Sequence, residues 1–213
     1  MRFKLLLPVF AIAFAAAPAF SDTFTFNIDN CTGTCGAAPF GTVTVTQDVN
    51  PNTVDIGVSL TSGNNFWSSG FPGSFGFNIT DPDPTISVNN LSSGWSLNST
   101  SGGSLHFDGF GNLDYALSCS DCGPHDDPVT SLSFSVTADG LTPASFQELS
   151  SIPPGSDRAY FVADIMGANG NTGVVGATLT STTAVPEPSS FLLSAAGALA
   201  LLMFLFGRRR KSA

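Results

Sequence analysis

The sequence predicts an all-β protein, an antiparallel β-sandwich or jelly-roll-like domain flanked by a signal peptide and one C-terminal transmembrane helix. Short segments alternate apolar and hydroxyl side chains, with the two-residue period of strands that bury one face. Clusters of Gly, Asn, Asp, Ser and Pro separate these segments and supply turns. Apolar runs lie near both ends of the 213-residue chain, so the strands are expected between them, in residues 20–184.

The predicted strands follow one another along this central region. The clearest alternation lies in residues 40–46, 54–60, 75–79 and 132–136. Further strand patterns lie in residues 23–28, 85–88, 104–107, 113–117, 160–165 and 174–179. No window has a helical period, and residues 145–149 are expected to form one short turn at most. Many short strands bounded by turns favour a two-layer β fold over an α/β fold.

Phenylalanine is the main apolar residue available to fill the core, with 19 in the chain. The aromatic residues fall at alternating positions, which are those of core side chains, and Trp67 and Trp95 are expected to cap or line the core. An aromatic platform for carbohydrate is the alternative, and the alternating positions disfavour it.

The N-terminus has the pattern of a secretory signal. Arg2 and Lys4 precede an apolar stretch over residues 5–17, and Ala17 and Ala19 place small side chains at the two positions that signal peptidase reads. We expect residues 1–19 to be removed, which leaves Phe20 as the new N-terminus.

The C-terminal 29 residues combine an extended segment, an apolar run and a basic end. In order they are Val185, Pro186, Glu187 and Pro188, the uncharged residues 189–207, and Arg208, Arg209, Arg210 and Lys211. At a rise of about 1.5 Å per residue, the strictly apolar residues 191–206 span roughly 24 Å, and the flanking residues bring the helix close to the ~30 Å of a bilayer core. Basic residues after the helix favour the cytoplasmic side, so the preceding domain is expected outside.

This order of features resembles the PEP-CTERM sorting signal of exported bacterial proteins. The resemblance implies recognition by the membrane enzyme exosortase, processing near residues 186–188, and a final location at the cell surface or outside the cell. A permanent membrane anchor without processing is the alternative. The strand pair in residues 40–60 and the glycine-spaced strands after residue 160 are similar to segments of the same group. This group has no common catalytic residues, so the resemblance implies no enzymatic activity.

The exported region is strongly acidic once both ends are set aside. Arg158 is its one basic residue, against 16 acidic residues, which gives a net charge of −15. Such a charge repels nucleic acid and attracts cations or cationic polymers. We therefore expect no nucleic-acid partner.

Four cysteines form two closely spaced pairs, Cys31 with Cys35 and Cys119 with Cys122. Export implies an oxidising compartment, so disulfides are expected. Four cysteines allow three connectivities, of which we favour the two local ones. A zinc site at Cys119, Cys122 and His125 with nearby aspartates is a disfavoured alternative, because the two spacings differ from those of a zinc ribbon.

Calcium is a second metal hypothesis, because several oxygen-bearing side chains lie close together in sequence. They are Asp81 and Asp83; Asp108, Asn112 and Asp114; and Asp126 and Asp127. None of these groups matches an EF-hand loop, and Asp beside Pro is ordinary in turns. The sequence thus predicts no metal site and no cofactor.

The sequence contains no recognisable catalytic motif, and its two histidines belong to none. A secreted glycan hydrolase using two carboxylates is disfavoured, because any pair of the many aspartates could be chosen. The preferred prediction is a non-enzymatic structural or adhesive protein associated with exopolysaccharide. An ice- or carbohydrate-binding module is the alternative, since Thr42, Thr44 and Thr46 lie on one strand face. The chain lacks the internal period expected of a flat ice-binding array.

Overall fold

The structure is a computed structural model that describes residues 19–70, 72–80, 85–99, 105–151 and 157–185. Nearly all of these residues belong to one unit, Phe20–Ala184, which is distinct from a second unit of Met1–Ala19 and Val185–Ala213. The predicted signal peptide up to residue 18 and the predicted helix at residues 189–207 lie outside the described residues. Within the described residues, no helix has the length and apolar character needed to cross a bilayer.

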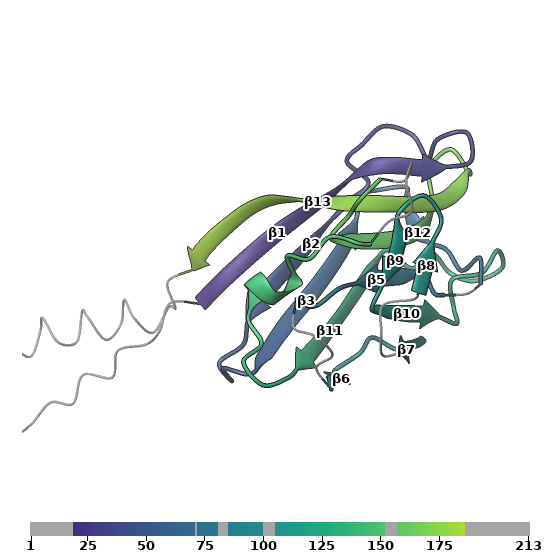
Figure 1. Cartoon of the computed structure of the whole chain (residues 1–213). Coiled ribbons are helices and arrows are strands. Elements are labelled where there is room, and N and C mark those ends of the chain that lie inside the picture. The colour runs from purple at the N-terminus through teal and green to yellow at the C-terminus, as the bar shows by residue number, and fades with distance from the viewer. Residues whose placement is uncertain (1–18, 71, 81–84, 100–104, 152–156, 186–213) are drawn as a thin grey trace, which may run out of the picture. The chain divides into compact units, whose positions relative to one another are not determined.

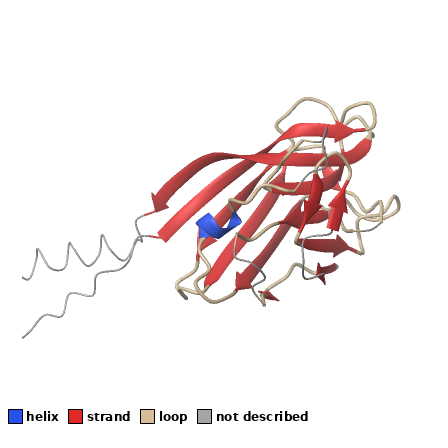
Figure 2. Ribbon diagram, viewed as in Figure 1, coloured by secondary structure: helices blue, strands red, loops and turns tan. Residues whose placement is uncertain are grey.

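The predicted all-β, antiparallel fold is confirmed (Figures 1 and 2). In chain order the strands are β1 (Ala19–Cys31), β2 (Gly41–Gln47), β3 (Thr53–Leu60), β4 (Asn65–Phe66), β5 (Phe75–Phe77), β6 (Ser87–Asn89), β7 (Trp95–Ser99), β8 (Leu105–Phe107), β9 (Gly111–Leu113), β10 (Tyr115–Cys119), β11 (Ser131–Thr137), β12 (Phe161–Met166) and β13 (Thr172–Val185). One turn of 3-10 helix, η1 (Pro143–Phe146), overlaps the predicted short turn at residues 145–149 and begins two residues earlier.

One antiparallel sheet makes up most of the domain and folds over on itself. Its strand order is β6-β11-β3-β2-β1-β13-β12-β5-β10-β7, and β4 pairs with β12 beside this path. β5 and β11 are far apart in that order, yet the rings of Phe75 and Phe77 lie 6.1 and 5.7 Å from the ring of Phe134. The two halves of the sheet therefore face each other. Its terminal strands, β6 and β7, are joined by only residues 90–94, so the sheet nearly closes.

Phenylalanine fills the space between the two halves, as the sequence predicts. Among the described residues, ten of the twelve largest fully buried side chains are Phe, and eight of the ten lie in this main core. Phe161 of β12 lies at the centre and contacts Phe24, Phe75 and Phe146, at ring-centroid distances of 4.8, 5.9 and 6.3 Å. Trp95 is buried edge-on against the ring of Phe66.

A short hairpin, β8–β9, covers part of the outer surface of the folded sheet. Leu105, Phe107, Phe110 and Leu113 of the hairpin region are buried against Ala116, Val162 and Val174 in a separate apolar cluster. A Cβ at Gly76 would lie 2.5 Å from the Phe107 ring, so β5 must carry glycine there for the hairpin to pack. Phe75, Gly76 and Phe77 are consequently all buried, whereas the sequence pattern predicts one exposed face for this segment.

Some strand boundaries differ from those predicted. Residues 113–117, predicted as one strand, are split between β9 and β10 at Asp114. Its backbone N–H donates to the side-chain oxygen of Asn78, 2.7 Å away, in place of a continuous ladder. β4, which has only two residues, and β7 were not predicted.

The two ends of the domain lie side by side, because β1 and β13 are antiparallel neighbours. The Thr180 and Thr25 hydroxyls are 2.7 Å apart, and the Thr183 hydroxyl donates to the Ser21 carbonyl at 3.3 Å. Phe20, 54% exposed, begins this strand pair, and β13 ends at Val185. The predicted N-terminus of the mature protein and the start of the predicted sorting signal therefore share one end of the domain (Figure 1).

Candidate functional site

Five neighbouring strands of the sheet, β11, β3, β2, β1 and β13, carry hydroxyl side chains on their outer side. In β2 the alternation is explicit, because Val43 and Val45 are buried whereas Thr42 and Thr44 are exposed. We call this surface the hydroxyl face. It comprises Thr23, Thr25, Thr42, Thr44, Thr46, Ser59, Ser131, Ser133, Ser135 and Thr180.

The strand register arranges these side chains in rows across the sheet. One row is Thr25, Thr42, Ser59 and Ser131, and the next is Thr23, Thr44, Gly57 and Ser133. Neighbouring strands are about 4.8 Å apart, and alternate residues of one strand are roughly 6.7 Å apart. The hydroxyl face is therefore a two-dimensional array, and its repeat arises from strand pairing and not from a repeat in the sequence.

Hydrogen bonds hold a third row of the array in place. The Ser135 hydroxyl donates to Asp55 Oδ1 at 2.7 Å, and the Asn90 amide donates to the Ser135 hydroxyl at 3.3 Å. The Ser21 and Thr46 hydroxyls are 3.2 Å apart. Thr42 and Thr44 are exposed, so their hydroxyls face solvent.

A groove of about 330 Å³ crosses the array above Gly57. Its polar lining includes Thr44, Thr46, Asp55 and Ser133. No atom lies within 4 Å of the position that a Cβ of Gly57 would occupy. The missing side chain thus leaves an opening in the row, with hydroxyls on both sides.

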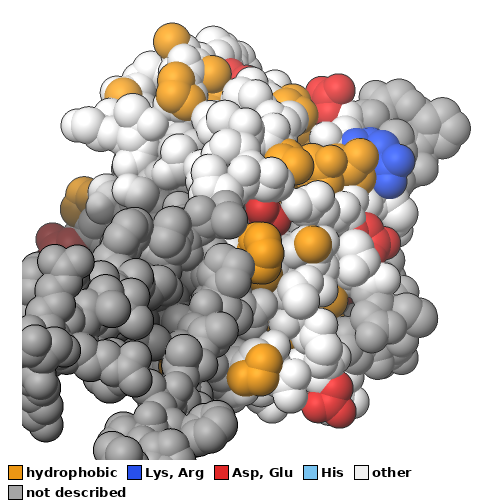
Figure 3. Space-filling model, turned by 90° about the vertical axis from the view of Figure 1, so that its left-hand side faces the viewer, with side chains coloured by type: hydrophobic (Ala, Val, Ile, Leu, Met, Phe, Trp, Pro, Cys, Tyr) orange, Lys and Arg blue, Asp and Glu red, His pale blue; other side chains and the backbone are white. Residues whose placement is uncertain are grey.

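The hydroxyl face is nearly uncharged, with Asp55 as the carboxylate in its rows. Arg158 lies elsewhere and donates from Nε and Nη2 to the backbone carbonyls of Ser150 and Leu149. On the side of the molecule that Figure 3 shows, most described atoms belong to the backbone or to side chains that are neither apolar nor charged, with scattered apolar and acidic side chains and one basic group. Such surfaces make hydrogen bonds to neutral polar ligands and give polyanions no basic patch to bind.

Both predicted disulfides are present in the structure, Cys31 with Cys35 and Cys119 with Cys122. The first closes the loop after β1, where the Asp29 carboxylate accepts hydrogen bonds from the Cys31 and Cys35 N–H groups. Asp29 lies close to the two sulfurs because of these hydrogen bonds, and the sulfurs are bonded to each other. The zinc alternative does not fit, because Cys119 and Cys122 are bonded to each other and provide no thiolate.

We expect the unfolded, unreduced protein to show no reactive thiol and the reduced protein to show four, as measured with a thiol reagent. Replacing Cys31 and Cys35 together by serine is expected to lower the free energy of unfolding by about 2 kcal/mol, because the closed loop is short. Urea unfolding measures this change. Free thiols in the unreduced wild-type chain would contradict the assignment.

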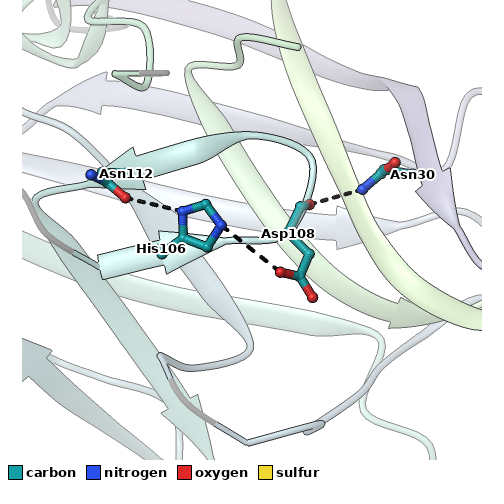
Figure 4. A network of polar contacts seen from close by, with 4 residues as sticks. All are labelled: Asn30, His106, Asp108 and Asn112. Atoms are coloured by element: carbon teal, nitrogen blue, oxygen red, sulfur yellow. Dashed lines mark hydrogen bonds and ion pairs between the residues drawn. The ribbon is translucent and has the colours of Figure 1, made fainter. Parts of the chain in front are cut away.

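Within the described residues, the aspartates of the calcium hypothesis do not form a cluster of three possible ligands. Asn112 is engaged with the ring of His106, its Oδ1 lying 3.1 Å from Nδ1 (Figure 4). Asp126 accepts the Gly123 N–H at 2.8 Å, as ordinary turn chemistry predicts. Asp81 and Asp83 lie outside the described residues.

One functional candidate that sequence reasoning missed is Asp164, a carboxylate in the middle of β12. It is only 2% exposed, and its Oδ2 accepts hydrogen bonds from the Ser69 N–H and hydroxyl. Burial raises the pKa of the Asp164 carboxyl above its usual value, the Ser69 hydrogen bonds lower it, and the nearby Asp108 carboxylate raises it further. The sequence around Asp164 gave no signal beyond an ordinary strand pattern.

The predicted processing residues lie at the limits of the described chain. Ala19 and Phe20 begin β1, and Val185 ends β13. Ala17 and Pro186, Glu187, Pro188, Arg208, Arg209 and Arg210 lie outside the described residues.

Comparison with known families gives one match, to the PEP-CTERM protein-sorting motif, over residues 184–211. The match covers the C-terminal segment for which the resemblance was found and leaves the β domain unassigned. Comparisons with curated proteins and with solved structures gave no match.

Proposed function

We propose that this exported protein, which carries a PEP-CTERM sorting motif and is sorted by exosortase, is a non-catalytic adhesive or structural component that contacts exopolysaccharide. The motif implies export, membrane anchoring and then association with the surface. The hydroxyl face is the observation that supports the proposed contact with exopolysaccharide. Signal peptidase would release the N-terminus, and exosortase would process the C-terminal signal.

The chemistry of the hydroxyl face favours a neutral or weakly cationic polysaccharide. Its exposed threonines and serines can donate and accept hydrogen bonds, as the hydroxyls of a sugar polymer do. The acidic domain repels polyanions, so highly anionic polymers and nucleic acid are poor partners. The rows extend across five strands, so one polymer chain can make several weak contacts at once.

A non-catalytic role is supported by the way the polar residues near the β8–β9 hairpin are bonded. The Ser69 hydroxyl donates to the Asp164 carboxylate, so this hydroxyl is not paired with a histidine base. His106 contacts Asn112 on one side and Asp108, at 3.9 Å, on the other (Figure 4). In neither arrangement does a serine hydroxyl donate to a histidine ring.

Blocking the groove tests the proposal. Gly57→Tyr places a ring in open space above the array, so we expect the fold to be kept and binding to be reduced about tenfold or more, by loss of contacts worth ~1.4 kcal/mol. Binding of the full-length chain is measured on the exopolysaccharide purified from the producing cell and on neutral dextran. Val49→Tyr adds the same ring at a 91% exposed turn position and is expected to bind as wild type does. Equal binding by both variants would contradict the assignment of the face.

Ice is a second candidate ligand, favoured by the regular rows of threonine on β1 and β2. The sequence lacks an internal period, but the strand register supplies a repeat in two directions. Thermal hysteresis of the full-length chain separates the two ligands. Hysteresis that Gly57→Tyr abolishes would favour ice, and binding to polysaccharide without hysteresis would favour the adhesive function.

A further inference from the structure

A hollow of about 390 Å³ lies at the end of the domain where β1 begins and β13 ends (Figure 1). The helical turn η1, blue in Figure 2, contributes one of its walls. The lining includes Phe20, Asp22, Gln47, Pro143, Gln147 and Thr182. None of these residues lines the groove above Gly57, so the hollow is a separate site. Its volume suits one small ligand.

Asp22 places a carboxylate on the inner side of β1. Alternate residues of a strand share one side, and Phe24 and Phe26, which follow Asp22 on that side, are fully buried in the core. Asp22 is only 5% exposed, and its Oδ2 accepts a hydrogen bond from the Gln147 amide at 2.8 Å. A carboxylate can accept about four hydrogen bonds, so Asp22 retains acceptor capacity for a ligand in the hollow.

The Asp22 carboxylate has no cationic side chain beside it. Arg158 is the one basic residue in residues 20–184, and it donates to the Leu149 and Ser150 carbonyls. Within the part of the chain that the structure describes, no ion pair involves Asp22. A carboxylate that has lost most of its water and lacks an opposite charge is stabilised when a cation binds next to it.

Phe20 supplies an aromatic surface in the same hollow. It is 54% exposed and is the one exposed phenylalanine among the described residues. The face of an aromatic ring attracts cations and packs against apolar surfaces such as the face of a sugar ring. Pro143 adds an apolar wall, while Gln47 and Thr182 offer polar groups for hydrogen bonds to hydroxyls.

We propose that this hollow binds an amino-sugar unit of a polysaccharide, with the ammonium group beside the Asp22 carboxylate and the sugar ring against Phe20. An amino sugar combines an ammonium group, an apolar ring face and several hydroxyls, and each of these matches one part of the lining. A neutral sugar lacks the charge, and an alkyl amine lacks the hydroxyls. The inference rests on the proposed contact with polysaccharide, but it concerns a different site from the hydroxyl face.

Calorimetric titration of the exported protein from the native cell, with a chitosan tetramer and with cellotetraose, tests the site. The two ligands share their ring and linkage, but cellotetraose carries a hydroxyl in place of each amine. At a pH where the amines are protonated, we expect the chitosan tetramer to bind at one saturable site and about tenfold or more tightly, because it alone can pair with Asp22. Asp22→Asn should remove most of this preference, and Phe20→Ala should weaken the binding of both ligands.

Asp127→Asn is the matched control for the charge. It removes the same charge from an exposed position in the loop before β11 and should leave the preference unchanged. This control separates pairing at Asp22 from the general attraction of the acidic domain for cations. Because Phe20 is exposed, Phe20→Ala is expected to fold, and it remains decisive even if Asp22→Asn does not fold.

The proposal is overturned if wild type binds the two tetramers equally, if Asp127→Asn lowers the preference as much as Asp22→Asn, or if Phe20→Ala binds as wild type does. A free α-ammonium at Phe20 that occupied the Asp22 carboxylate would give the first of these results. Gly57→Tyr changes only the hydroxyl face and should keep the preference. A failure of this inference is therefore distinguished from a failure of the proposed function, which is measured on the native exopolysaccharide.

Discussion

Replacing Phe161 by alanine is expected to lower the free energy of unfolding by about 3–5 kcal/mol, the range for a fully buried aromatic side chain. Phe161 is 0% exposed and packs against the rings of Phe24 and Phe75, which come from distant parts of the sequence. Truncation removes these contacts and leaves a cavity that the surrounding strands cannot close. Urea unfolding of the full-length chain with its disulfides intact measures the loss.

Phe20→Ala provides the matched control for this prediction. Phe20 also lies in a strand but is 54% exposed, so the same truncation should change the free energy of unfolding by no more than about 0.5 kcal/mol. A loss at Phe161 as small as that at Phe20 would mean that the aromatic cluster does not hold the two halves of the sheet together.

Replacing Pro186, Glu187 and Pro188 together by alanine is expected to abolish C-terminal processing in the native cell. These residues lie within the matched sorting motif, and two prolines keep the segment extended and accessible, whereas three alanines can continue a helix. Intact-mass analysis should show a wild-type protein shortened at its C-terminus. The triple variant should retain residues up to Ala213.

A double Ser189→Ala, Ser190→Ala variant changes adjacent residues and should be processed normally. Wild-type protein from cells without exosortase should have the same C-terminus as the triple variant. A triple variant that is shortened like wild type would show that these three residues are not needed for recognition. The same mass spectra test the predicted N-terminus at Phe20.

Strands with one solvent-exposed face were the easiest part of this fold to predict. β2, β3 and β11 alternate because their outer side faces solvent, and their predicted limits agree with the structure within two residues. The sequence also indicated the local cysteine pairs, because residues three or four apart are readily joined in a loop. The hydroxyl face could be predicted only in part, since Thr42, Thr44 and Thr46 indicate the exposed side of one strand but do not indicate which strands lie beside it.

Features that depend on contacts between distant segments could not be predicted. The β8–β9 hairpin covers β5 because Phe107 fits over Gly76, and no pattern in the sequence around either residue predicts that contact. The cavity at Asp164 depends on the same hairpin. Asp164 and Asp108 line the same small cavity only once the hairpin is packed on the sheet, so no local sequence pattern predicts it.

The position of β13 determines how this domain withstands a pull from its membrane end. β13 continues without interruption from Thr172 to Val185, where the sorting signal begins; β1 is its neighbour on one edge, and β12 pairs with its other edge over residues 172–177. A force along the strand axis must therefore shear many hydrogen bonds at once and cannot open them one after another. Tension on the C-terminal end of β13 therefore reaches the middle of the sheet without first peeling away an edge strand.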